Sequence, residues 1–409
     1  MHDDGGRYDV VVVGAGIVGL ATALKLLRRS PDLRLAVVEA ADRVAAHQTG
    51  HNSGVVHAGL YYAPGSLKAR LCRAGKEQLE DYAAEHGIPL ERCGKLVLAL
   101  SEGERPRLDA LAARATANGV PGLELLGPGA LREREPHAAG VAALWSPTTA
   151  IVDFERVAQA LASDVRDAGG TIELARQVMK IRSLPSEIVV ETPRGPLLTR
   201  NLITCAGVQA DRVARMTGYR SAARLVPFRG DYFVLTAEAR QLVRGLIYPL
   251  PDPRFPFLGV HFTRRIDGSV WAGPNAVLAF ARNGYRRRDV SVRDLAGTVA
   301  QPGFLRLAAR HWRMGAAEMA RDWSKRLFLR SLRRYVPELR LEQLAPGPSG
   351  VRAQLLERDG TLVDDFVLGG AGRILHVLNA PSPAATASLA IGDELAARAV
   401  ERFGLRGRA

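Results

Sequence analysis

Cysteine is scarce in this sequence, and the three cysteines that occur, Cys72, Cys93 and Cys205, lie far apart. No two of them form a C-x-x-C pair, which argues against a disulfide framework and against a zinc cluster, so we expect no metal site. We interpret all three as buried apolar residues of a protein in a reducing cytoplasm.

Long hydrophobic segments are also missing. No apolar stretch approaches the ~20 residues needed to span a bilayer. The first core strand begins at Tyr8, so we expect no signal peptide. With 409 residues, of which 47% are hydrophobic, the composition is typical of a soluble globular protein, and the length predicts two domains.

Acidic residues are outnumbered by basic ones, 42 against 56, which gives a net charge of +14. The excess is concentrated between Arg282 and Arg334, where fourteen Lys and Arg face four Asp and Glu. Such a field attracts anionic substrates, acidic lipid or nucleic acid. Most individual arginines, however, we interpret as ordinary surface residues of an Ala/Arg-rich chain.

The N-terminus carries a complete dinucleotide-binding fingerprint. A strand from Tyr8 leads into Gly14-Ala-Gly16-Ile-Val-Gly19 and a helix, and a second apolar run ends at Glu39. The first glycine permits the turn, the second lets the backbone approach a pyrophosphate, and the third lets the helix pack closely. The helix N-terminus at Ile17 presents N–H groups to phosphate, and Glu39 can accept hydrogen bonds from a ribose. The motif predicts a redox cofactor at the carboxyl edge of a parallel sheet.

The remaining pattern is parallel α/β at both ends and antiparallel between them. Strands are predicted at 95–100, 171–174, 177–181, 197–205, 228–235, 257–263, 269–272, 350–356 and 374–378. Helices are predicted at 66–86, 104–118, 153–168, 303–335 and 383–403. This order predicts an α/β fold with a discontinuous cofactor domain (1–90, 150–225 and 345–409). A mostly antiparallel α+β substrate domain takes up 91–149 and 226–344.

Six further motifs are long and unusual: His47–Tyr62, Pro227–Tyr232, Pro256–Arg264, Gly273–Phe280, Gly350–Gln354 and Asn379–Thr386. With them the chain resembles the bacterial L-2-hydroxyglutarate dehydrogenases, also called oxidases, over about residues 8–400. These are FAD enzymes of the D-amino-acid-oxidase-like superfamily. The resemblance implies FAD rather than NAD, a glutathione-reductase-type cofactor domain, and a peripheral link to a respiratory quinone at the inner face of the cell membrane.

The resemblance also implies which segments contact the cofactor. The loop after the acidic residue runs beneath the flavin, a later strand touches adenine through its backbone, and a turn before the second domain lies beside the cofactor. The start of the last helix aims N–H groups at the flavin pyrimidine, although Pro381, Ser382 and Pro383 replace glycines found in many relatives. The residues so assigned are Thr49, Ser53, Gly54, Val178, Ala206, Gly207, Ser382, Ala384, Ala385 and Thr386.

Oxidising a 2-hydroxy acid requires a base for the hydroxyl proton, and histidine suits this role because its ordinary pKa lies near working pH. Of nine histidines, His57 in the flavin loop and His261 in an alternating strand are the candidates. We rank His57 first for its proximity to the flavin. Some relatives attach flavin covalently at a histidine in a similar setting, and covalent attachment at His57 would exclude it as the base.

A dicarboxylate substrate also needs cations that grip its carboxylates. Arg352 is the best candidate, because Gly-Val-Arg-Ala-Gln precedes the last cofactor helix, and Arg229 and Arg264 follow. The alternative for each arginine is a surface ion pair. Further candidates, as hydroxyl donors or as added charge, are Tyr61, Tyr62, Tyr232 and Lys95.

The basic helical region at 303–335 has two interpretations. On a helical wheel Arg306, Arg310 and Arg313 share one face, with Trp312 and Met319 toward the other. Such a helix can lie in a membrane interface, where it would bring the flavin close to quinone. It can also pack its apolar side on its own protein.

Other functions stay open at this stage. An FAD enzyme acting on malate, glycerol 3-phosphate or an amino acid is the nearest alternative, although a zwitterion would need an anionic or neutral amine site. A flavoprotein that binds RNA would use the basic surface, but we find no RNA-binding motif and expect no nucleic-acid partner. A non-catalytic flavin-binding protein would hold a flavin that no acid reduces.

Overall fold

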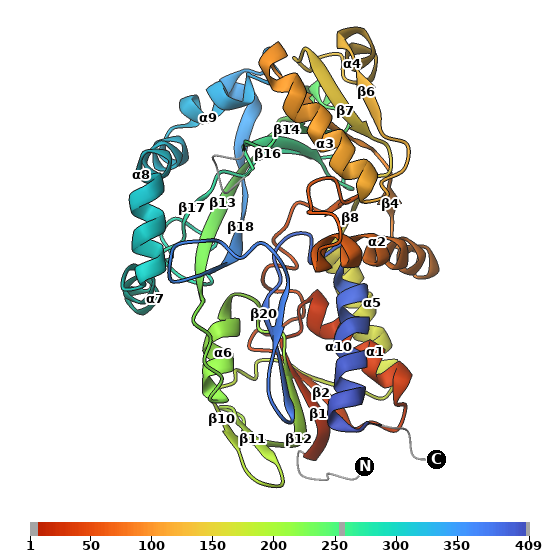
Figure 1. Ribbon diagram of the computed structural model, residues 1–409, viewed down its shortest axis with the longest axis vertical. Helices are drawn as coiled ribbons and strands as arrows, with labels where there is room; N and C mark the ends of the chain where they lie inside the picture. Colours follow the sequence, from red (N-terminus) through yellow and green to blue (C-terminus); the bar gives the residue numbers. More distant parts are fainter. Residues whose placement is uncertain (1–6, 253–257, 406–409) are drawn as a thin grey trace.

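The computed structural model describes residues 7–252 and 258–405, and two large sheets organise it (Figure 1). In the first sheet β1 pairs in parallel with β2 on one side and with β12 on the other, and β20 extends the parallel set beyond β12. Its eight strands are β1 (Arg7–Val13), β2 (Leu35–Val38), β9 (Thr171–Glu173), β10 (Lys180–Ser183), β11 (Ile188–Glu191), β12 (Leu197–Thr204), β19 (Val367–Gly369) and β20 (Ile374–Asn379).

Helices cover both faces of this sheet, because β1 is apolar on both. Val10 and Val12 pack among residues of α1, α5 and α10, whereas Val11 and Val13 pack on the opposite face with Val213 of α6. Figure 1 shows α1, α5 and α10 together on one side, with α6 on the other. The helices of this part are α1 (Ile17–Arg29), α2 (Leu67–Glu85), α5 (Phe154–Asp167), α6 (Ala210–Met216) and α10 (Ser388–Phe403).

The second sheet is antiparallel except where β14 pairs in parallel with β5. The long strands β13 and β18 pair along most of their length and form one side of it. Its nine strands are β5 (Lys95–Ala99), β6 (Glu124–Leu126), β7 (Ala142–Ser146), β13 (Arg224–Leu235), β14 (Leu246–Pro249), β15 (His261–Arg264), β16 (Val270–Gly273), β17 (Val277–Leu278) and β18 (Leu344–Leu356).

A small third sheet consists of β8 paired with β3 and β4. In the sequence, these strands lie between strands of the two large sheets. Helices α7, α8 and α9 flank the β13–β18 side of the second sheet, and α3 and α4 lie at its far end (Figure 1). The bounds are β3 (Val55–Val56), β4 (Leu90–Glu91), β8 (Ala150–Val152), α3 (Arg105–Ala117), α4 (Pro128–Arg134), α7 (Val292–Val299), α8 (Pro302–Trp323) and α9 (Lys325–Leu332). None of the helices in the described ranges is both long and apolar enough to cross a bilayer.

Four details differ from the prediction. The boundary at residue 345 assigns β18 to the cofactor domain, but β18 pairs with β13, because an exposed edge of that twelve-residue strand needs a partner. The strand predicted at 177–181 is Lys180–Ser183, so Val178 precedes it, and the last helix begins at Ser388 rather than at 383. The predicted strand at 257–263 begins at His261, and Pro256 and Phe257 lie outside the described residues.

Candidate active site

A large cavity of about 1240 Å³ lies between the first and second sheets. This volume exceeds the roughly 300–1,000 Å³ of common small-molecule sites, so the cavity has room for a dinucleotide together with a small substrate. Its wall begins at the glycine turn after β1 and reaches β13, β15 and β18 of the second sheet. The two ends of the cavity differ in their chemistry and are described in turn.

The glycine turn forms the first end and requires glycine sterically. Gly14 has φ +107°, and a Cβ there would lie 2.4 Å from the carbonyl oxygen of Cys205. A Cβ on Gly19 would lie 1.9 Å from the carbonyl oxygen of Gly14, so this glycine lets α1 pack against the turn. Gly16 is the N-cap of α1 and lines the cavity, together with Ile17. The turn therefore presents the N-terminus of α1 to the cavity.

Two side chains brace this turn. Glu39 accepts hydrogen bonds from the Ala15 amide at 2.8 Å and from the Ala41 amide at 2.9 Å, and it lines the cavity while 8% exposed. Thr49 Oγ1 accepts a hydrogen bond of 3.0 Å from the Ile17 amide. The loop after β2 is thus fastened to the start of α1.

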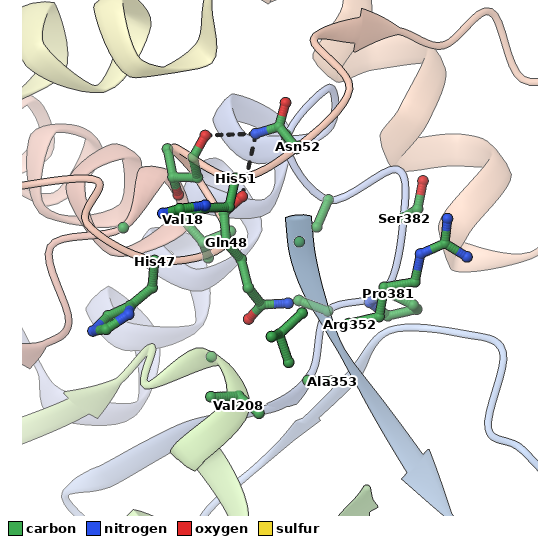
Figure 2. A pocket seen from close by; sticks show the side chains of 18 of the residues that line it. Val18, His47, Gln48, His51, Asn52, Val208, Arg352, Ala353, Pro381 and Ser382 are labelled. Carbon is green, nitrogen blue, oxygen red and sulfur yellow. Dashed lines mark hydrogen bonds between the residues drawn. The ribbon is translucent and has the colours of Figure 1, made fainter. Parts of the chain in front are cut away.

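The loop that carries Thr49 continues along the cavity. Figure 2 shows Gln48 reaching toward the middle, with His47 on one side and Arg352 and Ser382 on the other. The Asn52 amide donates to the carbonyl oxygens of Gln48 and Thr49, which fixes the loop. Ser53 lines the cavity.

Gly54 is placed differently from the expectation, because it does not form part of the described cavity wall. It has φ +74°, and a Cβ there would lie 2.5 Å from the Arg265 guanidinium and 2.8 Å from the Val152 carbonyl oxygen. Its role is close packing beneath the loop rather than contact with a ligand.

The other residues assigned to the cofactor converge on the same wall: Val178, Ala206, Gly207, Ser382, Ala384, Ala385 and Thr386. The last four, however, form a turn that precedes α10. In it the amides of Ala384 and Ala387 donate to the carbonyls of Pro381 and Pro383. The expected helix start at this position is therefore wrong. Thr386 Oγ1 instead accepts a hydrogen bond of 3.1 Å from the His57 amide, which joins the turn to the flavin loop.

His57 and His261 both line the second end of the cavity. His261 Nδ1 lies 2.9 Å from the Gly259 carbonyl oxygen, so this nitrogen carries the proton and Nε2 keeps its lone pair. Burial lowers the pKa of His261 to about 3, with smaller contributions from Arg352 and Lys95. Burial also holds the pKa of His57 well below its usual value, assisted by Lys95, His261, Lys68 and Arg352. Both imidazoles are therefore uncharged at neutral pH.

Of the three candidate arginines, the structure brings only Arg352 to the cavity. No ion pair to Arg352 is found within the described residues. On β13 the side chains alternate, so Gly230 and Tyr232 line the cavity while Arg229 points the other way. Arg229 is 3% exposed and pairs with Asp231 at 3.0 Å and Asp322 at 3.2 Å. The prediction that Arg229 binds substrate is wrong.

Arg264 is also wrongly assigned. It lies three residues after His261 on β15 and so points to the opposite face, where it pairs with Glu91 at 2.9 Å. Within a strand, closeness in sequence to a candidate histidine therefore does not predict that a residue reaches the cavity, because side chains alternate between the two faces.

Lys95 lies behind the cavity wall rather than in it. Its side chain is 0% exposed, and in the described part of the chain Nζ has no hydrogen-bond partner. Nζ sits 4.1 Å from the ring centre of Tyr248 and 5.4 Å from that of Tyr61. Burial lowers the pKa of Lys95 to about 7. Its charge reaches the cavity through space, since it lowers the pKa of both His57 and His261.

The three candidate tyrosines, Tyr61, Tyr62 and Tyr232, all line the cavity. Burial raises the pKa of each, so their hydroxyls stay protonated and can donate. The Tyr61 hydroxyl is buried and has no hydrogen-bond partner among the described residues. A donor in this position is available to a ligand.

Tyr248 and Lys68 are among the cavity residues that sequence reasoning missed. Tyr248 of β14 stacks on His261 with ring centres 3.9 Å apart. Lys68, in the first turn of α2, also lines the cavity although it is 6% exposed. Neither had a local signal. A lysine near a helix start resembles any surface lysine, and β14 was not predicted as a strand.

The chain matches known proteins over nearly its whole length. The model of the family described as FAD dependent oxidoreductase (DAO) matches residues 9–398. A mitochondrial L-2-hydroxyglutarate dehydrogenase of Nematostella vectensis is 47% identical over 98% of this chain and 92% of that protein. An L-2-hydroxyglutarate dehydrogenase of Indibacter alkaliphilus is 44% identical over 97% of this chain and 100% of that protein.

A solved structure shares the fold. L-α-glycerophosphate oxidase from Mycoplasma pneumoniae, with FAD bound, has a TM-score of 0.79 at 21% identity, covering 97% of this chain and 95% of that one. These matches confirm the predicted fold class and FAD. The cavity fits this cofactor, since its glycine turn leaves no room for a Cβ and its volume suits a dinucleotide. The chain therefore belongs to the family of FAD-dependent oxidoreductases that includes the L-2-hydroxyglutarate dehydrogenases.

Proposed function

We propose that this chain oxidises L-2-hydroxyglutarate to 2-oxoglutarate. The observation that carries the proposal is a single cavity that joins the dinucleotide turn to two uncharged histidines and to Arg352, an arginine without an acidic partner in the described residues. The names of the relatives in Nematostella vectensis and Indibacter alkaliphilus point to the same substrate. A base and an anion clamp are what the oxidation of a 2-hydroxy acid needs from the protein.

The cofactor would lie along the first end of the cavity. Gly14, Gly16, Ile17 and Gly19 would take the pyrophosphate at the N-terminus of α1, and Glu39 would take a ribose. The wall residues Thr49, Ser53, Val178, Ala206, Gly207, Ser382, Ala384, Ala385 and Thr386 would contact the rest. When bound, FAD accepts the hydride that leaves the substrate α carbon.

The hydroxyl proton goes to a histidine, and we assign it first to His57. His57 lies on the flavin loop, and its backbone is fixed to Thr386 beside it. Its low pKa in the free protein keeps it unprotonated and ready. His261 is the second candidate, because its Nδ1 is engaged with Gly259 and Nε2 can accept. A general base of this kind contributes about 10²- to 10⁴-fold to a rate.

The charge of the substrate changes the pKa of this base. Three cations, Lys95, Lys68 and Arg352, each lower the pKa of His57 in the free protein. A dianion that enters the cavity offsets these charges, so the pKa of the imidazole rises toward working pH as the substrate binds. Arg352 would hold the carboxylate next to the reacting carbon, with the Tyr61 and Tyr232 hydroxyls as further donors. Tyr62 would close the same wall.

We further propose that a membrane quinone takes the electrons. On α8, Trp312 is 63% exposed and Trp323, the last residue of the helix, is 73% exposed. Arg306, Arg310 and Arg313 are exposed on the same helix. Exposed tryptophans among arginines favour an interface with anionic lipid, to which each nearby Arg adds about 1 kcal/mol.

The substrate is tested by anaerobic stopped-flow reduction of the purified flavoprotein. L-2-hydroxyglutarate should bleach the flavin band, while D-2-hydroxyglutarate, malate, glycerol 3-phosphate and glycine should leave it yellow on the same timescale. Bleaching by one of the other acids, with none by L-2-hydroxyglutarate, would contradict the proposal. A quinone analogue should then restore the band.

The membrane surface is tested separately by co-sedimentation with lipid vesicles. We expect binding to vesicles with anionic lipid, weakened by salt and by replacing Trp312 and Trp323 with alanine. Equal sedimentation with purely zwitterionic vesicles, or no loss in the double variant, would argue that α8 only covers its own protein.

A further inference from the structure

Lys68 is a cavity cation whose ammonium pairs with an acidic side chain of the same cavity. Its Nζ donates to the Asp364 carboxylate at 2.7 Å and to the Asp364 carbonyl oxygen at 2.9 Å. Both residues line the cavity. The two partners differ sharply in exposure: the lysine side chain is 7% exposed and the aspartate side chain 89%. The ammonium thus belongs to the interior, and its counter-ion reaches it from the solvent side.

Lys68 also lies within electrostatic reach of the reacting centre. It lowers the pKa of His57, and so does Arg352. Its Nζ is 5.2 Å from the ring centre of Tyr62, another residue of the cavity wall. A molecule seated at His57 therefore has one cation from α2 and one from β18 close to it.

Such an arrangement matches a ligand with an anionic group at each end. We infer that the Lys68 ammonium holds the second carboxylate of the substrate, and that the Asp364 carboxylate takes that place in the free enzyme. This inference rests on the proposed dicarboxylate substrate and deepens it, since it names the residue that selects a diacid over a monoacid.

Replacing the Asp364 carboxylate by a substrate carboxylate at Lys68 costs little free energy. An ion pair with a largely exposed partner contributes little to stability, so Asp364 is easily displaced. A nearly buried ammonium, in contrast, needs an acceptor at all times, and an incoming carboxylate supplies one. The released Asp364 side chain is already in water and regains its full hydration there.

The surrounding loop does not depend on the Asp364 carboxylate. The Asn379 amide donates to the carbonyls of Val363 and Asp365, at 2.9 Å each. The Asp365 carboxylate accepts from the Lys68 amide, and Phe366 packs in a buried cluster with Leu71. A change at Asp364 should therefore leave the loop in place.

The inference predicts that substitutions at Lys68 and at Asp364 affect glutarate binding differently. The measurement is equilibrium binding of glutarate, and of the monoacid pentanoate, to the FAD-loaded enzyme, followed by the change in flavin absorbance. Neither ligand has a hydroxyl group to oxidise, so the readout does not need turnover. Lys68→Met should weaken glutarate binding by about 10- to 100-fold and leave pentanoate unchanged, as expected for a lost charge-assisted hydrogen bond.

Asp364→Asn should act the other way, because it removes the competing carboxylate. We expect glutarate to bind the same or a few-fold more tightly. Lys68→Arg should retain most of the affinity. The matched control is Lys76→Met, a lysine of the same helix that pairs with Glu80 and does not form part of the described cavity wall.

The two variants separate a ligand-binding role from a structural one. If Lys68 only anchors the loop, Lys68→Met and Asp364→Asn should weaken both acids alike, and that result would overturn the inference. Failure of Lys68→Met to affect glutarate more than Lys76→Met does would overturn it as well. If instead the binding pattern holds but L-2-hydroxyglutarate is not oxidised, the proposed reaction fails while the diacid site stands.

Discussion

The cofactor end and the substrate end of the cavity differ in how the chain builds them. At the cofactor end Gly14, Gly16 and Gly19 are neighbours in sequence, and the backbone of this turn forms the end of the cavity. At the substrate end His57, His261 and Arg352 come from three distant segments and meet only in the folded protein. The first end is a local structure that carries its own signature, whereas the second depends on the whole topology.

The two ends also differ in charge. Polar groups near the glycine turn are paired, as Glu39 is with the Ala15 and Ala41 amides. At the substrate end Lys95 is buried without a hydrogen-bond partner in the described residues, and it lies near two imidazoles and Arg352. An excess of buried positive charge is unfavourable alone. Such an excess at the substrate end indicates a site whose charge is balanced only when a dianion binds.

Breaking the cofactor end should have the largest effect. Gly14→Ala places a Cβ 2.4 Å from the Cys205 carbonyl oxygen at φ +107°, so the turn must move and the N-terminus of α1 with it. We expect purified Gly14→Ala to lose bound FAD, measured as the ratio of flavin to protein absorbance, and to lose activity with it.

The control for this change is Gly65→Ala. Gly65 also has positive φ, +79°, but a Cβ there meets nothing within 4 Å. This variant should stay yellow, because it carries the backbone strain without the collision. Equal flavin loss in both variants would mean that strain in general, and not the geometry of the turn, controls binding.

Replacing the candidate bases should come next. His57→Gln should slow flavin reduction by L-2-hydroxyglutarate by about 10²- to 10⁴-fold while FAD stays bound, because the base is lost and the cofactor end is intact. His261→Gln should cost less if His57 is the base. Stopped-flow rates decide the order, and the larger loss at His261 would reverse our assignment.

This contrast explains how much the sequence could tell. The glycine turn and Glu39 were predictable, because spacing along one strand and helix defines them. Arg352 was found through its motif, His57 through its place in the expected flavin loop, and His261 through its place in an alternating strand. These residues reach the same cavity, as expected.

The errors share a physical cause. Arg229 and Arg264 lie in motifs near the site, but strand alternation turns them away, and each pairs with an acidic residue outside the cavity wall. Asp322, which pairs with Arg229, stands almost a hundred residues later and could not be foreseen as its partner. Lys68 and Tyr248 were missed for the converse reason, since only tertiary packing brings α2 and β14 to the cavity.

Comparing Arg352 with Arg229 tests this explanation directly. Arg352→Met should raise the KM for L-2-hydroxyglutarate by about 10- to 100-fold with little change in thermal stability. Arg229→Met leaves the half-exposed Arg287 as the cation that Asp231 and Asp322 share. It should therefore destabilise the fold by about 1–3 kcal/mol and affect KM little in the folded protein. Thermal unfolding and initial rates measure both. A KM effect confined to Arg229→Met would restore the original expectation.

The smallest expected effect on substrate binding comes from the uncompensated charge of Lys95, which lies behind the tyrosines of the cavity wall. Its pKa of about 7 lies below the ordinary value, so the folded state holds fewer protons than the unfolded state between about pH 7 and 10. In that window rising pH stabilises the native protein, and below it the burial penalty is complete. Lys95→Met removes the penalty and should raise the free energy of unfolding by about 5 kcal/mol near pH 6, and by progressively less toward pH 10.

Denaturant unfolding of the FAD-loaded protein at several pH values measures this difference, with Lys76→Met as a lysine whose side chain is paired with Glu80. If Lys95 serves the substrate through its charge, the more stable variant should also bind glutarate less tightly at pH 6. Near pH 9 the difference in binding should vanish, because the native amine has lost its proton there. A variant that is stabilised without any loss of affinity would mean that the buried charge is only a cost to the fold, and that the excess of cations at the substrate end does not serve binding.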